Sequence, residues 1–275
     1  MTPEKLSDAD FIKEATSIVE QASKDNVILR IIGAVAVYIR SANIPNAVDI
    51  YRKVKRLNSS SSQFTDVDFM AYGKQRKEIV NFFEKKLRFK PESRLNALFG
   101  GTRMMYHHPE NKYHVDIFFD KLEFSHDVHF GSKPGQGRLE LDFPTITLED
   151  IVLEKLQIHN INLKDIVDLI VLLVGHDVSE SKTREVIDGR YIADTLAKDW
   201  GFWYDAVQNL KLVKQYADKF SSEGSIRGED HDLIIERVDK LLKIIDETPK
   251  TKDWLKRAQK GTAKPWYREV EDVVR

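Results

Sequence analysis

The sequence contains no cysteine, so the chain has neither disulfide bonds nor a thiolate metal site. It also lacks an apolar run that approaches the roughly 18 residues needed to span a membrane. Its first residues, "MTPEKLSDAD", lack the basic region and the apolar stretch of a signal peptide. These absences predict a cytoplasmic protein that makes no use of a membrane. No internal repeat is present, and 275 residues suffice for one large domain or two ordinary ones.

A large net charge is absent as well, but the formal value of -1 hides an uneven distribution. Residues 51–105 carry thirteen Lys and Arg against five Asp and Glu, whereas residues 106–154 carry four against ten. A basic segment beside an acidic centre suits a site that handles both a cation and an anionic substrate. Taken alone, the basic run "KQRKEIVNFFEKK" is also typical of a solvated helix face.

Hydrophobic periodicity divides the chain near residue 145. Before it, the pattern predicts a helix over 7–23, a strand up to Ile32, a turn at Gly33 into a helix, a strand over 64–72 and a helix over 74–87. Residues 88–142 then look strand-rich, in short runs that include "LNALFGG" and "RLELDF". From Thr147 onward the pattern is helical, near 147–157, 162–174, 189–198, 203–221, 228–246, 250–260 and 265–274. We therefore expect an α+β protein with a mixed α/β domain over 1–145 and a helical domain over 146–275.

Two aspartates interrupt the apolar run "FTDVDFMAY" at 64–72. In a strand, residues two apart point to the same face, so Asp66 and Asp68 would lie side by side. Like charges this close repel, which favours a divalent cation between them, although D-x-D triplets are also common in surface loops. A second apolar strand, "HVDIFFD" at 114–120, carries Asp116 on one face. Gly33 and Ala34 open a strand-to-helix turn where a phosphate could approach backbone amides, although glycine there is also typical of an ordinary tight turn.

These pieces together resemble the nucleotidyltransferase superfamily to which DNA polymerase β belongs. Its pattern is a helix-opening G-[GS], then D-h-[DE]-h and a distant h-[DE]-h, where h is apolar. Gly33, Asp66, Asp68 and Asp116 match this pattern, whereas Ala34 stands where Gly or Ser is expected. The resemblance implies a nucleotidyltransferase-like mixed sheet with flanking helices, an NTP substrate, and Mg²⁺ (or Mn²⁺) held by Asp66, Asp68 and Asp116.

The resemblance extends into the second half of the chain. The segment "LEDIVLEKLQIHNINLKDIVDLIVLL" at 148–173 is similar to the AbiEii-type toxin branch, in which a lysine precedes a K-D-x-x-D-L element; Lys155, Lys164, Asp165 and Asp168 fall on these positions. The resemblance implies that Lys155, Lys164 or Arg56 balances the triphosphate charge. Asp165 and Asp168 share a helix face, where they either pair with a lysine or support the site from behind.

Five of the eight histidines fall within residues 107–129. His126 and His129 in "HDVHF" raise the alternative of a zinc site, which needs three or four convergent ligands. His114 precedes Asp116 by two residues, so we expect it in the same cleft, stacking on a base or hydrogen-bonding Asp116.

Three functions follow from these features. The first is a metal-dependent nucleotidyltransferase that moves NMP from an NTP to an acceptor, which is RNA, a protein or a small molecule. The second is a catalytically weak or silent binding module of the same fold, in one version half of a toxin–antitoxin pair with a small antitoxin-like partner. The third is a zinc hydrolase.

Overall fold

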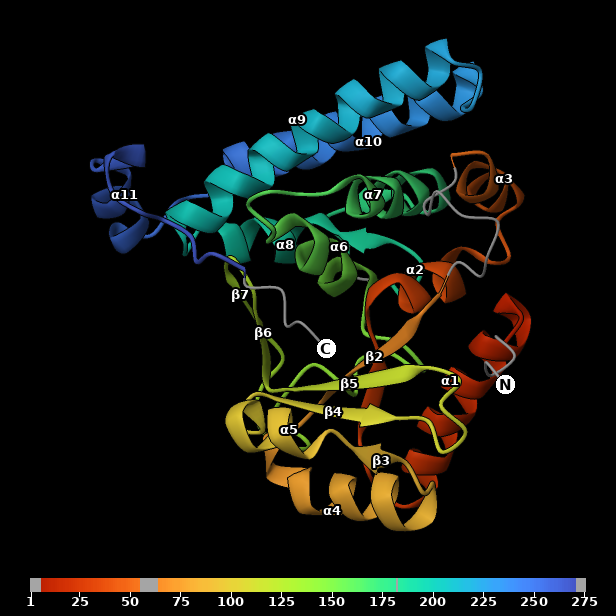
Figure 1. Cartoon of the computed structure of the whole chain (residues 1–275). Coiled ribbons are helices and arrows are strands. Elements are labelled where there is room, and N and C mark those ends of the chain that lie inside the picture. Colours follow the sequence, from red (N-terminus) through yellow and green to blue (C-terminus); the bar gives the residue numbers. More distant parts are fainter. Residues whose placement is uncertain (1–5, 55–63, 182, 271–275) are drawn as a thin grey trace. The chain divides into compact units, whose positions relative to one another are not determined.

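The structure, a computed structural model, describes residues 6–54, 64–181 and 183–270 (Figure 1). Over these residues the chain is α+β, as predicted, with a mixed sheet, two small two-stranded ladders and many helices. It divides into two compact units, the first from 1–39, 57–122 and 129–147 and the second from 40–56, 123–128 and 148–275, as far as these ranges are described. Within the described residues, no helix is long and apolar enough to cross a membrane.

The first unit is built on a mixed sheet. In the described residues its strand order is β1 (Leu29–Ile31), β2 (Asp66–Ala71), β5 (His114–Phe119), β4 (Arg103–His107) and β3 (Lys90–Pro91). β2 runs parallel to β5, and every other neighbouring pair is antiparallel. The predicted strands around Asp66, Asp68 and Asp116 are thus confirmed, and they are neighbours inside the sheet.

One face of this sheet is apolar because strand residues alternate between faces. Phe69 on β2 lies with its ring centroid 6.2 Å from that of Phe83, which in turn stacks on Tyr106 of β4 at 5.3 Å. Phe83 belongs to the π-helical turn Asn81–Lys86, which follows the short elements Gly73–Gln75 and α4 (Arg76–Val80). Burying one such ring contributes about 1.5–3 kcal/mol, so this face is the main core of the unit. The polar side chains of these strands lie on the other face, beside the buried Met70 and Phe118.

Helix α1 (Asp8–Lys24) begins at the predicted place. The side chain of Ser7 accepts a hydrogen bond from the backbone N–H of Asp10 and caps the helix. Its buried side chains, Phe11, Ala15, Ile18, Val19 and Ala22, follow the helical spacing seen in the sequence. α1 packs against β1.

Two strand predictions in this unit are wrong. Residues 95–101 were expected to be extended, but α5 (Ser93–Phe99) occupies most of that stretch. Asn96 explains the helix, because its side chain bonds to both the N–H and the C=O of Met105 and so fastens α5 beside β4. The run 138–143 is irregular, and its backbone is held by single bonds such as Leu139 N–H to the Tyr72 hydroxyl.

The second unit is helical. Its elements are α3 (Pro45–Lys53), α6 (Leu148–Leu156), α7 (Leu163–Gly175), α8 (Gly189–Leu196), α9 (Trp200–Ser222), α10 (Gly228–Glu247), α11 (Lys252–Ala258) and the 3₁₀ turn Gly261–Ala263. α10 packs against α7, α8 and α9, and α3 packs against α7. The short ladder β8 (Val178–Ser179) with β9 (Ile187–Asp188) precedes α8, and β6 (Lys121–Glu123) pairs with β7 (Asp127–His129). The sequence pattern predicted the helices after Thr147 and missed α3.

A buried carboxylate, Asp205 on α9, is a centre of polar contacts in this unit. His126 Nε2 lies 2.7 Å from its Oδ2, while His159 Nδ1 and Trp266 Nε1 lie 2.9 and 3.0 Å from its Oδ1. Burial alone would raise the pKa of Asp205, but the hydrogen bonds from His126, Trp266 and His159 outweigh it, and the pKa lies below its ordinary value.

The chain near its end does not continue the helical pattern. A helix was predicted over 265–274, yet residues 264–270 are irregular and the rest of that range lies outside the described residues. Tertiary bonds fix this backbone instead. Besides the Trp266 bond to Asp205, Arg268 donates its N–H to the C=O of Ser125 and pairs with Asp127.

Candidate metal centre

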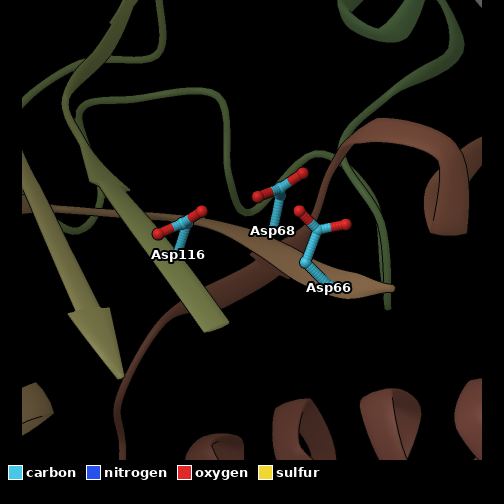
Figure 2. Close-up of side chains that lie close together, drawn as sticks. All are labelled: Asp66, Asp68 and Asp116. Carbon is cyan, nitrogen blue, oxygen red and sulfur yellow. The ribbon is translucent and has the colours of Figure 1, made fainter. Parts of the chain in front are cut away.

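Three carboxylates meet on the polar face of the sheet. Asp68 of β2 is the direct register partner of Asp116 on β5, and Asp66 precedes Asp68 by two residues. Figure 2 shows all three side chains pointing to the same side of the two strands. One oxygen from each lies within 4.8 Å of the others, and within the described residues this is the group of His and carboxylate side chains whose geometry suits a metal ion.

The local sequence explains why these groups gather. Val67 and Phe69 are buried on the apolar face, which forces Asp66 and Asp68 onto the opposite face. Parallel pairing of β2 with β5 in this register then sets Asp116 beside Asp68, whereas a slip of one residue would turn Asp116 into the core. Asp116 is 1% exposed, and Asp66 and Asp68 are half-buried.

The chemistry of this donor set fits a hard divalent cation. Carboxylate oxygens are the ligands that Mg²⁺ and Mn²⁺ take, and no soft or nitrogen donor belongs to the group. Three negative charges this close repel one another, so binding a cation relieves the repulsion. Asp66, Asp68 and Asp116 are therefore well matched to Mg²⁺.

Arg103 is a member of this site that the sequence reasoning missed. It lies on β4, two residues before Met105, which is the register partner of Asp116. Its Nη2 donates to Asp116 Oδ2 at 2.7 Å, and its guanidinium carbon lies 4.9 Å from the centre of the Phe118 ring. Arg103 therefore places a positive charge directly on one of the three carboxylates. The alternation of Arg103, Met105 and His107 along a strand indicates that their side chains share one face. That Arg103 meets Asp116 follows only from the register of β4 against β5.

The predicted turn at Gly33 adjoins the carboxylates. β1 pairs with β2, and the next residue, Ile32, donates its N–H to the C=O of Asp68 at 3.0 Å. Gly33 then adopts φ +68°, a left-handed conformation that glycine takes without steric cost, and α2 (Gly33–Ser41) begins there. The helix N-terminus and Ala34 in its first turn thus follow directly on the backbone that hydrogen-bonds Asp68.

The predicted sheet face of His114 is confirmed, whereas its stacking on a base or its hydrogen bond to Asp116 stays a prediction. His114 is the register partner of Asp66 and lies on the same face as Asp116. Its ring meets the ring of His107 edge to face, with centroids 4.6 Å apart, and His107 Nε2 is 3.1 Å from Glu92 Oε2. A row of polar side chains thus leads across the sheet from Asp66 to Glu92.

The predicted residues of the second half form a group of their own. Lys155 Nζ lies 2.9 Å from Asp165 Oδ1 and 3.0 Å from Asp168 Oδ2. The expected pairing of the two aspartates with Lys155 is confirmed, but the group is buried, with 7% of the Lys155 side chain and none of the Asp168 side chain exposed. Lys164 is exposed at the start of α7. Contacts of Lys155 and Lys164 with a nucleotide stay predictions, and Arg56 lies outside the described residues.

The histidine alternative receives no support from the geometry. His126 bonds to Asp205, and His129 is exposed at the end of β7. Within the described residues neither belongs to a group of three ligands that suits a metal.

Comparison with known proteins adds no relative. No protein-family model, no curated protein and no solved structure matches the chain.

Proposed function

We propose that this chain is a metal-dependent nucleotidyltransferase that transfers NMP from an NTP to an acceptor. The observation that carries the proposal is the meeting of Asp66, Asp68 and Asp116 within 4.8 Å on one face of β2 and β5. The mixed sheet and the Gly33 turn that follows β1 support the same proposal, since both belong to the nucleotidyltransferase pattern that the sequence resembles.

In this reaction an acceptor oxygen attacks the α-phosphorus, a new P–O bond forms, and the bond to the β-phosphate oxygen breaks with its electron pair leaving on pyrophosphate. Asp66, Asp68 and Asp116 would hold Mg²⁺ or Mn²⁺, which supplies charge stabilisation to the oxygens around the α-phosphorus. Asp116 is the carboxylate that accepts the proton of the attacking hydroxyl. Its bond from Arg103 orients the carboxylate for this task.

The triphosphate is assigned to the turn that opens α2. Backbone N–H groups at a helix N-terminus bind phosphate, and the absence of a Cβ at Gly33 lets a phosphate approach the backbone. Lys155 and Lys164 are assigned to the triphosphate charge only through the resemblance of their segment to the AbiEii-type branch. The acceptor, whether RNA, a protein or a small molecule, is left open by this proposal.

Two observations favour the second candidate, a catalytically weak or silent binding module. Arg103 already neutralises part of the charge of Asp116, and Ala34 replaces the small polar or glycine residue of the family pattern. Neither feature would impair a protein that uses the fold only for binding, for example of an antitoxin-like partner.

Transfer of label separates the two candidates. The four α-labelled NTPs are incubated with tRNA, with total protein and with aminoglycosides, with and without Mg²⁺ or Mn²⁺. The enzyme proposal expects metal-dependent incorporation that Asp116→Asn lowers by roughly 10²- to 10⁴-fold, the range for losing a positioned acid-base group. Glu78→Gln, which removes an exposed carboxylate on α4, should leave incorporation unchanged. Metal-dependent NTP binding without incorporation into any acceptor would favour the binding module.

A further inference from the structure

A pocket of about 250 Å³ adjoins the first of the three carboxylates. Its lining comes from the start of α1, from the residues that precede β2 and from the turn that precedes β5. The volume is slightly below the roughly 300–1,000 Å³ typical of pockets for drug-sized ligands. It therefore suits one ring system rather than a whole nucleotide.

The apolar wall of the pocket is aromatic and held in place. The rings of Phe11 and Phe64 stack with centroids 5.6 Å apart, and Phe11 also contacts Tyr113 at 5.2 Å. All three side chains are at most 5% exposed, and the Tyr113 hydroxyl donates to Glu14 Oε1 at 2.9 Å. Such a wall is apolar and fixed, so a ligand can pack against it without any rearrangement of these rings.

Two residues of the pocket lie next to Asp66. The Thr65 hydroxyl donates to Asp66 Oδ1 at 3.1 Å, and His114 is the register partner of Asp66. The lining of the pocket is therefore next to Asp66, one of the three carboxylates.

The rim of the pocket is polar. Asn111 is exposed at the end of a tight turn, with φ +56° and its N–H bonded to the C=O of His108 at 2.8 Å. Lys112 follows it, with Nζ held 2.8 Å from Glu110 Oε2. An amide that both donates and accepts, next to an ammonium that donates, matches the mixed donors and acceptors on the edge of a heterocyclic base.

We propose that this pocket binds a nucleobase, which deepens the proposed function and rests on it because the carboxylates beside the pocket are then the site of transfer. The pocket has an apolar wall, a polar rim and a position beside Asp66. A base in a nucleotide has matching apolar faces, a polar edge and an attached phosphate chain. The base belongs either to the NTP or to the terminal nucleotide of an acceptor, and these two sources share the same chemistry.

The test uses two rim variants with matched controls. Asn111→Gly removes the amide and keeps the left-handed backbone; its control is Asn26→Gly, an exposed asparagine with φ +58° outside the pocket. Lys112→Met removes the ammonium; its control is Lys53→Met, which likewise loses a lysine paired with a nearby carboxylate, at 2.7 Å. Calorimetry on the full chain measures binding of the four nucleosides without metal, and of Mg²⁺ with tripolyphosphate or with α,β-methylene NTPs.

We expect at least one nucleoside to bind. Asn111→Gly and Lys112→Met should each weaken its affinity about 5- to 150-fold, the range for one base contact, and the control variants should leave the affinity unchanged. Absence of nucleoside binding, or equal effects of the rim variants and their controls, overturns the proposal. If saturation with the α,β-methylene NTP blocks the nucleoside, the pocket takes the base of the NTP; if the nucleoside still binds, it takes the base of the acceptor. If the full chain binds a nucleoside but does not bind Mg²⁺ with tripolyphosphate, the proposed transfer reaction is wrong while the proposed base pocket is supported.

Discussion

Replacing Lys155 with methionine removes the charge from a buried ion cluster and keeps an unbranched side chain of similar length. At 2.9 and 3.0 Å, each carboxylate attracts the ammonium by about 5–6 kcal/mol at an effective dielectric constant of about 20, most of which offsets desolvation. Without the lysine, the buried charge of Asp168 and the half-buried charge of Asp165 repel each other with no cation between them. Breaking such a cluster lowers the unfolding free energy by about 3–5 kcal/mol. This is a large part of the total unfolding free energy of a folded protein, which is roughly 5–15 kcal/mol.

Thermal and urea unfolding at pH 7 measure this loss. At roughly 2–4 °C per kcal/mol for a chain of this size class, Lys155→Met should melt about 6–20 °C below wild type. Lys164→Met, which removes the neighbouring exposed charge, should change little. The double variant Lys155→Met with Asp168→Asn should recover part of the loss, because it also removes a buried negative charge. Wild-type stability of Lys155→Met would refute the idea that this buried cluster depends on its cation.

Three further predictions concern other sites. Asp205→Asn should destabilise the protein at neutral pH. Because the pKa of Asp205 is lowered in the folded state, its contribution to stability is present above the unfolded pKa of about 3.9 and is lost as the pH falls through the folded pKa. Urea titrations that find the same loss of unfolding free energy in the variant at pH 7 and at pH 3 would contradict this prediction. Gly33→Val should lower stability by about 1–3 kcal/mol and weaken Mg²⁺·NTP binding, whereas Ala34→Ser should keep or improve that binding; calorimetry that finds Gly33→Val equal to wild type would remove the phosphate role of the turn. Arg103→Met should lower the unfolding free energy of the metal-free protein by about 1.5–3 kcal/mol, because the hydrogen bond to Asp116 is lost. It should also tighten Mg²⁺ binding, because the arginine and the cation compete for the Asp116 carboxylate. Weaker Mg²⁺ binding in this variant would contradict that competition.

The sequence predicted that Asp66 and Asp68 lie together because that signal is local. Strand alternation alone places Asp66 and Asp68 on one face. Asp116 was grouped with them through the family resemblance, because its place beside Asp68 depends on the register of β5 against β2. The sequence did not predict the contact of Arg103 with Asp116, because this contact depends on the register of β4 against β5. The sequence of a single strand does not determine its register against a neighbouring strand.

The errors in secondary structure have a similar cause. α5 is short, and the apolar run that it contains looks extended; its helix is secured by the bonds of Asn96 to Met105. The irregular segment 264–270 has a helical pattern, but its bonds to Asp205, Ser125 and Asp127 compete with helix formation. In both cases tertiary contacts override local propensity.

Calorimetric titration of Mg²⁺ with a non-hydrolysable NTP into the three carboxylate variants tests the central claim most directly. Asp66→Asn and Asp68→Asn should lose metal-dependent nucleotide binding, because each removes a charge from the ion that holds the nucleotide. Asp116→Asn should still bind Mg²⁺·NTP while transfer falls, and Glu78→Gln should bind like wild type. If Asp66→Asn and Asp68→Asn bind Mg²⁺·NTP as wild type does, the three carboxylates are not a metal site and the proposed nucleotidyl transfer is wrong.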